Sequence, residues 1–154
     1  MIRQAVATDK VQVILLLKAS REEAGFDRAD GLSGFYFPYD AAYAERLFLE
    51  HLGAGRCCFV LVDRGVVRGV LMARAAEHEF GPVRLARETV WFIEPKHRGR
   101  GALGMLDAYE AWAREHGCAF AGMGGMGEDP AVGLLYRRRG YRGAETLFLK
   151  GLAG

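Results

Sequence analysis

The sequence predicts a mixed α/β fold, in which helices cover a mixed sheet and the element order is β-α-α-β-β-β-α-β-α-β. Short apolar runs bounded by Gly, Pro or Asp recur along the chain, as strands do, and apolar residues at helical spacing lie between them. In addition, a helix separates the strand candidates 87–93 and 118–123, which predicts a parallel crossover. A length of 154 residues fits one domain over residues 1–154.

The first predicted elements are a strand and a helix. Residues 2–7 alternate apolar and polar side chains, which predicts a short strand. Thr8-Asp9 supplies an N-cap for a helix whose apolar run is Val11–Leu17. Residues 25–39, with the sequence GFDRADGLSGFYFPY, are rich in Gly and aromatic side chains and predict an irregular loop.

A second helix and a hairpin follow this loop. Asp40 is placed to cap a helix over Ala41–Leu52. The apolar run CCFVLV at 57–62 predicts a buried strand, and residues 66–73 return as the next strand. Asp63-Arg64-Gly65 between them is a turn signal, so the two strands are expected to form an antiparallel hairpin.

The second half of the chain alternates strands and helices. Residues 87–93 predict a strand that Pro95 stops, because proline cannot donate to a sheet ladder. Apolar residues on one face predict an amphipathic helix over 102–116, and the small residues at 118–123 predict a strand. The chain closes with two more expected elements, a short helix at 130–140 and a last strand at 141–150.

The composition excludes several classes of protein. A net charge of +2 is too small to predict a nucleic-acid or anionic-membrane partner, and no apolar run reaches membrane-spanning length. Cys57, Cys58 and Cys118 are odd in number and lie among apolar residues, which argues against a disulfide framework, and no His/Cys spacing predicts a metal site. The opening MIRQAVATDK has no apolar core, so we expect no signal peptide and a cytoplasmic protein.

The stretch HRGRGALG at 97–104 carries the strongest functional signal. Its glycines formally spell G-x-G-x-x-G, a pattern of dinucleotide-binding loops. The N–H groups at a helix start have no intrahelical partner, the helix dipole makes that end positive, and Arg98 and Arg100 add charge and hydrogen-bond donors. The stretch therefore predicts a phosphate-binding loop, and the alternative is a tight turn with solvated arginines.

Two well-known phosphate-binding loops do not fit this stretch. A dinucleotide loop needs its glycines directly after the strand and an acid about 20 residues further on. Here Glu94 to Arg98 separate the strand from Gly99, and the following strand CAFAGM contains no acid. A P-loop is excluded because G-K-[ST] is missing.

The order of motifs resembles the acetyl-coenzyme A site of the GNAT superfamily of N-acetyltransferases. A strand ending VWFIEP, then KHRGRG, then an amphipathic helix ending REHG is similar to that family's cofactor motif, R/Q-x-x-G-x-G/A. Arg98-Gly99-Arg100-Gly101-Ala102 matches the first five positions. The sixth is Leu103 rather than Gly or Ala, with Gly104 one place later, which puts the fine geometry of the first helical turn in question.

The resemblance covers nearly the whole chain. The opening IRQAVATD, the late segment PAVGLLYRRRGY and the ending ETLFLK are each similar to segments of that family. It implies a GNAT-like acyl-CoA N-acyltransferase fold and the transfer of an acetyl group from acetyl-CoA, without a metal, to a primary amine of a small molecule or protein. The last strand could also pair or exchange between two subunits of a homodimer.

The resemblance also implies which residues bind the cofactor. The pantetheine arm would lie along the fourth strand and the pyrophosphate on the amides of residues 99–104. Asp129 stands where the family often has an asparagine that orients the cofactor, and its alternative role is the N-cap before Pro130. The implied cofactor-binding set is Trp91, Phe92, Ile93, Arg98, Gly99, Arg100, Gly101, Ala102, Leu103, Gly104 and Asp129.

Two residues are the catalytic candidates. Tyr136 matches the family's tyrosine in L-Y-x-x-x-G, the usual general acid toward the sulfur, or else packs on the sheet edge. Glu88, expected to face the same side of its strand as Val90 and Phe92, is either a general base with a raised pKa or a strand-end partner of Arg87 or Arg84. His78 and Glu79 are alternative bases or surface groups, and His97 and His116 are expected to be solvated.

Some alternatives remain open at this point. The aromatic stretch GFYFPY at 34–39 either walls the acceptor pocket, where rings attract an ammonium group, or folds its loop down by its own rings. The chain could also be an inactive acyl-CoA-binding or protein-interaction module on the same fold. A nucleic-acid binder that uses HRGR and RRR is the third hypothesis, against which the slight net charge counts.

Overall fold

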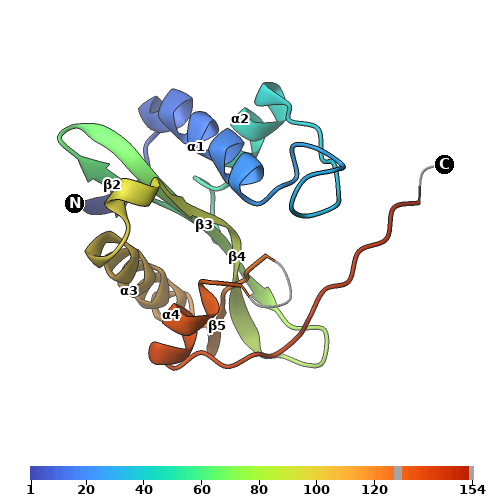
Figure 1. Cartoon of the computed structure of the whole chain (residues 1–154). Coiled ribbons are helices and arrows are strands. Elements are labelled where there is room, and N and C mark those ends of the chain that lie inside the picture. Colours follow the sequence, from blue (N-terminus) through green and yellow to red (C-terminus); the bar gives the residue numbers. More distant parts are fainter. Residues whose placement is uncertain (127–129, 153–154) are drawn as a thin grey trace.

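A five-stranded sheet with helices on both faces forms the body of the protein (Figure 1). The computed structural model describes residues 1–126 and 130–152. The strands are β1 (Ile2–Gln4), β2 (Arg56–Asp63), β3 (Val66–Glu77), β4 (Arg84–Ile93) and β5 (Phe120–Gly122). The helices are α1 (Lys10–Glu23), α2 (Ala41–Glu50), α3 (Arg100–Glu115) and α4 (Gly133–Arg138), with single 3-10 turns η1 (Ala7–Asp9) and η2 (Pro95–His97).

The sheet topology confirms the predicted fold class. The strands lie in the order β1-β2-β3-β4-β5; each pair from β1 to β4 is antiparallel, and β4 pairs with β5 in parallel. Helix α3 makes the parallel crossover that the strand candidates 87–93 and 118–123 predicted. The β2–β3 turn is also confirmed, because Arg64 and Gly65 both adopt positive φ, as a tight hairpin requires.

Two apolar clusters hold the helices on the sheet. On one side, here called the α3 face, Met105, Tyr109 and Trp112 of α3 pack against β2, β3 and β4. On the other, here called the α1–α2 face, Val13 of α1 and Phe48 of α2 pack against the opposite side of the same strands. Figure 1 shows α1 and α2 above the sheet and α3 and α4 below it. Each face of the sheet is therefore covered by its own helical layer.

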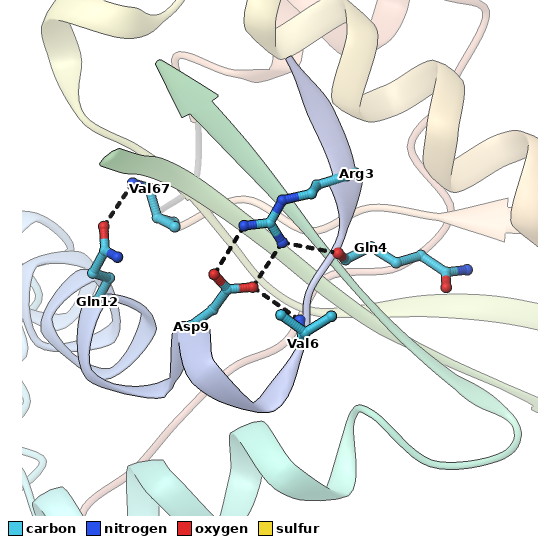
Figure 2. A network of polar contacts seen from close by, with 6 residues as sticks. All are labelled: Arg3, Gln4, Val6, Asp9, Gln12 and Val67. Atoms are coloured by element: carbon cyan, nitrogen blue, oxygen red, sulfur yellow. Dashed lines mark hydrogen bonds and ion pairs between the residues drawn. The ribbon is translucent and has the colours of Figure 1, made fainter. Parts of the chain in front are cut away.

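A polar network joins β1 to the start of α1 (Figure 2). The buried carboxylate of Asp9 accepts two hydrogen bonds from the Arg3 guanidinium, at 2.8 and 3.0 Å, and one from the Val6 N–H at 2.8 Å. The side chain of Gln12 accepts from the N–H of Val67 at 2.7 Å. The predicted N-cap is corrected here, since the Asp9 side chain caps the preceding turn η1 and makes no cap bond to α1. The predicted cap at Asp40 is confirmed by a bond from the Tyr43 N–H.

The last strand predicted at 141–150 is wrong. Residues 141–152 form no helix or strand in the structure, although they include the apolar run Leu147–Leu149. A strand exists only when a neighbour accepts and donates its backbone hydrogen bonds, and no described segment of this chain pairs with these residues. Figure 1 shows the segment leaving the body of the protein beyond β4 and β5.

The described residues contain neither a membrane-spanning helix nor a cluster of metal ligands. Within residues 1–126 and 130–152, no helix is long and apolar enough to cross a bilayer. Over the same residues, no three His, Cys, Asp or Glu side chains gather as metal ligands would.

Candidate active site

A β-bulge in the middle of β4 organises the candidate site. Met72 of β3 pairs with Val90, whereas the next residue, Ala73, pairs with Glu88, so Thr89 is the extra residue. A bulge of this kind bends its strand and reverses the order in which later side chains alternate. Parallel pairing with β5 also ends close by, at Arg87. In the described part of the chain, β4 after that point pairs with β3 alone.

The bulge overturns the predicted orientation of Glu88. Simple alternation places Glu88 on the same face as Val90 and Phe92, but those two side chains pack on the α1–α2 face. Glu88 instead pairs with Ala73 of the cluster on the α3 face, where Trp91 also packs. The extra residue at Thr89 is the reason, because it shifts the alternation by one position.

Glu88 and Tyr136 meet at Gly124, in the loop that follows β5. The Glu88 carboxylate accepts a hydrogen bond from the Gly124 N–H at 3.1 Å, and the Tyr136 hydroxyl donates to the Gly124 carbonyl at 2.6 Å. Burial raises the pKa of Glu88 to about 7, although the bond from Gly124 lowers it. Burial and the nearby Glu88 charge raise the pKa of Tyr136. The structure therefore brings the two predicted catalytic residues together, with one acid that titrates near neutrality and one phenol that stays protonated.

Tyr136 lies within a group of aromatic rings. Its ring stacks on that of Trp91, with centroids 6.1 Å apart, and the Tyr141 ring lies tilted against it, with centroids 5.6 Å apart. The Tyr141 hydroxyl donates to the Glu110 carboxylate of α3 at 3.1 Å. The predicted alternative, a tyrosine packed at the sheet edge, is thus partly true of Tyr136, because the same packing fixes the direction of its hydroxyl.

The predicted pantetheine-binding residues lie beside this cluster, but their side chains lie on different faces of the sheet. The side chain of Phe92 is buried on the α1–α2 face and that of Ile93 on the α3 face. The Ile93 carbonyl already accepts a hydrogen bond from the Arg98 side chain at 2.8 Å. The indole N–H of Trp91 is buried and has no hydrogen-bond partner among the described residues. An orphan donor beside an unpaired strand edge fits a polar ligand that lies along β4.

The predicted phosphate loop forms the N-terminus of α3, which begins at Arg100 rather than at Ala102. Gly99 is its N-cap, at a φ of 98°, a conformation that favours glycine. The first intrahelical bond runs from the Leu103 N–H to the Gly99 carbonyl at 3.3 Å. The amides of the residues before Leu103 thus lack helical partners, as an anion site needs.

Two glycines of this stretch serve packing. A Cβ at Gly101 would lie 2.6 Å from a methyl group of Leu61, and a Cβ at Gly104 would collide with the Ile2 side chain. These glycines let α3 approach β1 and β2 closely. The Leu103 side chain, which departs from the family motif, is exposed and lies on the outer side of the first turn. Ala102 is buried in the cluster on the α3 face.

The two arginines of the loop have different surroundings. Arg98 donates to both oxygens of Glu23, at the end of α1, at 2.7 and 2.9 Å, and its guanidinium lies 5.7 Å from the centre of the Phe92 ring. The Arg100 side chain is exposed and forms no hydrogen bond or ion pair with any other described residue. Arg100 is therefore the loop cation that is free to meet a phosphate, and Arg98 ties the end of β4 to α1. Asp129 lies outside the described residues.

Three further polar side chains were not predicted. The buried Tyr109 hydroxyl of α3 donates to the Gly122 carbonyl at 2.7 Å. The ring of Tyr141 packs against that of Tyr136. On the other face, the buried His51 ring contacts the Leu47 carbonyl through Nδ1 at 2.8 Å and the Thr89 hydroxyl through Nε2 at 2.6 Å. Burial lowers the pKa of His51, so the ring is neutral, donating from Nδ1 and accepting at Nε2. Periodicity marked Tyr109 only as part of an apolar stripe, and no pattern marked His51.

The loop after α1 is held down by its aromatic rings. Phe37 stacks on Phe26 with ring centroids 4.5 Å apart, and the Tyr39 hydroxyl donates to the Ile14 carbonyl of α1 at 3.1 Å. These contacts support the interpretation that the loop is folded by its own rings. Tyr36 remains exposed, with the Arg21 guanidinium 5.7 Å from its ring centre.

A depression lies on the far part of the β3–β4 hairpin. Its volume is about 230 Å³, and it is lined by Arg74, Ala76, Glu77, Glu79, Leu85 and Arg87. The exposed Glu79 carboxylate lies 3.8 Å from the Arg87 guanidinium and 3.3 Å from the His78 ring.

His97 is less solvated than expected, because Asp63 and Glu94 flank its ring.

Comparison with known proteins agrees with this geometry. The model of the acetyltransferase (GNAT) family matches residues 26–141. No curated protein matches the chain significantly in sequence. A solved ribosomal-protein-alanine N-acetyltransferase from Brucella melitensis biovar Abortus is similar, with 15% identity, a TM-score of 0.73 and 99% of each chain covered.

Two further solved structures share the fold. One is described as a predicted acetyltransferase with acetyl-CoA from Clostridium acetobutylicum, with 16% identity, a TM-score of 0.75, and 99% of this chain and 96% of that chain covered. The other is an aminoglycoside 6'-N-acetyltransferase from Acinetobacter haemolyticus, with 13% identity, a TM-score of 0.74, and 99% of this chain and 98% of that chain covered. At such identities the likeness shows a common fold.

Proposed function

Because the chain belongs to the acetyltransferase (GNAT) family, we propose that it transfers an acetyl group from acetyl-CoA to a primary amine of a small molecule or protein. The observation that carries this proposal is the meeting of Glu88 and Tyr136 at Gly124, beside the strand edge that β4 leaves unpaired. A base that titrates near neutrality and a protonated phenol are the two groups that acyl transfer to an amine requires. The functional unit we propose is the whole chain, residues 1–154, as one domain.

The residues of the chain fit acetyl-CoA as the acyl donor, which supplies an activated thioester when bound. The free amides at the start of α3 and the cation of Arg100 would bind the pyrophosphate. The unpaired edge of β4, with the orphan indole N–H of Trp91, would hold the pantetheine arm. Phe92 and Ile93 contribute backbone rather than side chains, because both side chains are buried in the core. Asp129 completes the proposed cofactor-binding set.

Glu88 is the proposed general base. An alkylammonium group must lose a proton before its nitrogen attacks a carbonyl carbon, and a carboxylate with a pKa of about 7 accepts that proton near neutral pH. The hydrogen bond from the Gly124 N–H holds one carboxylate oxygen, so the other oxygen is the one that faces the amine.

Tyr136 is the proposed general acid. As the nitrogen–carbon bond forms and the carbon–sulfur bond breaks, the thiolate of coenzyme A leaves, and the Tyr136 hydroxyl gives it a proton. The raised pKa of Tyr136 keeps the phenol protonated at neutral pH, so its proton is present when the thiolate forms. The nitrogen loses a second proton to solvent as the amide forms, and the phenolate recovers the proton that Glu88 took from the ammonium, so one cycle releases the thiol of coenzyme A and one net proton.

The partners of this reaction are acetyl-CoA and an amine acceptor, and we also propose a homodimer.

Burial raises the pKa of the Cys57 thiol to about 12 and raises that of Cys58, so neither is a ready nucleophile. Three free cysteines suit a reducing compartment, and the cytoplasm is the location we propose.

Two measurements on the full chain test this function. Coenzyme A should raise the melting temperature, because a ligand at about 100 times its Kd adds ~2.7 kcal/mol to the native state. A panel of aminoglycosides, polyamines and peptides with free N-termini should then reveal acetyl transfer by mass increase of the acceptor. No thermal shift with coenzyme A would contradict the proposal. A shift without transfer to any acceptor would favour the inactive acyl-CoA-binding module.

A further inference from the structure

Three arginines form a row across three neighbouring strands of the sheet. Arg56 of β2 pairs directly with Arg74 of β3, and Arg74 pairs with Arg87 of β4. Side chains of directly paired residues lie on the same face. Cys58 and Met72, each two residues away along its strand, pack on the α1–α2 face. The three arginines, here called the arginine row, therefore lie on the α1–α2 face of the sheet.

Two members of the arginine row have no charged partner among the described residues. Arg56 and Arg74 are exposed, and their side chains form no hydrogen bond or ion pair with any residue that the structure describes. Like charges placed directly opposite each other on neighbouring strands are destabilising. Elsewhere the β3–β4 hairpin follows the opposite rule, since Glu77 pairs with Arg84. A row of like charges is a feature that a bound anion would stabilise.

A depression lies at one end of the arginine row. It holds about 230 Å³, and both Arg74 and Arg87 line it. Glu77 and Glu79 line it as well, and the nearer contact, from Glu79 to Arg87, is 3.8 Å. Glu145 is also 3.8 Å from Arg87, and both distances exceed hydrogen-bond range. Neighbouring strands lie about 4.8 Å apart, so two guanidiniums here can hold the oxygens of one carboxylate or phosphate.

The arginine row ends beside the candidate active site. Arg87 directly precedes Glu88 and is the last residue of β4 that pairs with β5 in the described part of the chain. Burial lowers the pKa of His51, and the charges of the other two arginines of the row add to this effect. The same His51 ring contacts the Thr89 hydroxyl at 2.6 Å. The row thus lies next to the bulge at Thr89, on the face opposite to the Glu88 carboxylate.

We propose that the arginine row binds an oxyanion, a carboxylate or a phosphate, carried by the same small molecule whose amine is acetylated. The acceptor class, which rests on the proposed function, is therefore a small amine with an anionic group. The amine would lie at Glu88, and the body of the acceptor would cross the open edge of β4 to the arginine row. Because its two ends lie on opposite faces of one sheet, their separation should be less than the spacing of about 10 Å between packed sheets.

The first test compares acceptors of similar length that differ at the end remote from the amine. ε-Aminocaproate and ω-aminopentyl phosphate carry an oxyanion, n-hexylamine carries no second charge, and hexamethylenediamine carries a cation. With the wild-type chain, at least one oxyanion acceptor should give a kcat/KM about 10-fold or more above the last two, and the better of the pair identifies the group. Equal or faster transfer to n-hexylamine or the diamine would leave the proposed function standing and overturn the acceptor class.

Arg74→Gln removes the middle guanidinium of the row. It should raise KM for the oxyanion acceptor about 10-fold and leave kcat/KM for n-hexylamine unchanged. The free energy of unfolding should stay the same or rise, because two like-charge contacts are relieved. Arg64→Gln is the matched control, since Arg64 is exposed in the turn at the opposite end of the β2–β3 hairpin. Equal changes in KM for both variants, or an equal loss with n-hexylamine, would overturn the assignment.

Calorimetry gives a result even if no acceptor is acetylated. ε-Aminocaproate and ω-aminopentyl phosphate are each titrated into the full chain in the presence of excess coenzyme A. At least one should bind, Arg74→Gln should weaken its binding about 10-fold, and Arg64→Gln should not. Binding of this kind without acetyl transfer would contradict the proposed function and support the anion site. No binding of either compound, or binding that Arg74→Gln does not weaken, would overturn the anion site.

Discussion

Glu88 and Tyr136 are joined through the backbone of a single residue. The Gly124 N–H donates to the Glu88 carboxylate at 3.1 Å, and the Gly124 carbonyl accepts from the Tyr136 hydroxyl at 2.6 Å. One comes from a bulged strand and the other from a helix after β5, so tertiary structure alone brings them together. A change in the position of Gly124 would move both groups at once.

Replacing Tyr136 with Phe should slow turnover without weakening cofactor binding. The ring and its stacking on Trp91 remain, but the proton donor is lost, and a general acid contributes about 10²-fold or more to the rate. Steady-state kinetics should show the fall in kcat, and calorimetry should show an unchanged Kd for coenzyme A. Tyr43→Phe, at an exposed position on α2, is the control. An unchanged kcat in Tyr136→Phe would remove the general-acid role.

The rate should depend on the protonation of Glu88. Because the base must be ionised, kcat/KM should rise with pH up to a pKa of about 7 and then level off. Glu88→Gln should lower kcat/KM about 10²-fold and flatten this limb of the profile. Glu79→Gln is the matched control, since Glu79 is exposed in the loop before β4. If the control variant alone loses the limb, Glu79 is the base.

The two arginines of the loop should respond differently to replacement by Ala. Arg100→Ala should weaken coenzyme A binding about 3- to 10-fold and leave stability unchanged, because the exposed Arg100 side chain forms no hydrogen bond or ion pair with another described residue. Arg98→Ala should lower the free energy of unfolding by about 1 kcal/mol, because the contacts with Glu23 and the Ile93 carbonyl are lost. Titration calorimetry and urea unfolding on both variants separate the effects. Equal losses of affinity and of stability in both would contradict this division.

Gly101→Ala should destabilise the protein, although Ala favours helices by about 1 kcal/mol over Gly. The added Cβ would lie 2.6 Å from a Leu61 methyl group, and overpacking of this kind costs about 1–3 kcal/mol. Urea unfolding should therefore show a net loss of about 1 kcal/mol. Gly81→Ala, where a Cβ meets nothing within 4 Å, should be neutral. A stabilised Gly101→Ala variant would show that α3 does not lie against β2 as described.

Asp9→Asn should lower stability by about 1–3 kcal/mol, because hydrogen bonds between charged partners are lost from a buried site. The bonds from Arg3 lower the pKa of Asp9 in the folded state. The stabilisation is thus present above the unfolded pKa of about 3.9 and is lost as pH falls below it. Urea midpoints between neutral and acidic pH should fall less steeply for Asp9→Asn than for the wild type. Parallel curves would contradict a lowered pKa.

Periodicity was sufficient to predict most of the fold, because the helices and the β2–β3 hairpin are encoded locally. The apolar stripe of α3 predicts a helix, and the residues Arg64-Gly65 predict a tight turn, without any information from other parts of the chain. The last strand at 141–150 was wrong for the opposite reason. Its sequence has the apolar run Leu147–Leu149, but a strand depends on a partner that the local sequence does not specify.

The sequence predicted which residues form the candidate site better than it predicted where their side chains lie. Motif spacing pointed to Tyr136 and the loop before α3, and an acid within an apolar strand pointed to Glu88. The structure brings Tyr136 and Glu88 together at one residue. The face on which Glu88 lies was not predictable, because the bulge at Thr89 depends on how β3 and β4 align. The buried His51 that contacts Thr89 belongs to no sequence motif at all.

The bulge in β4 has a consequence for changes in chain length. Thr89 has no partner on β3, so a chain lacking this one residue would keep Glu88 and Trp91 on the same face. One residue removed anywhere between Val90 and Ile93 would instead turn the side chains beyond it to the wrong layer. Homologous sequences are thus expected to gain or lose a residue in this strand at one place only, next to Glu88, the proposed general base.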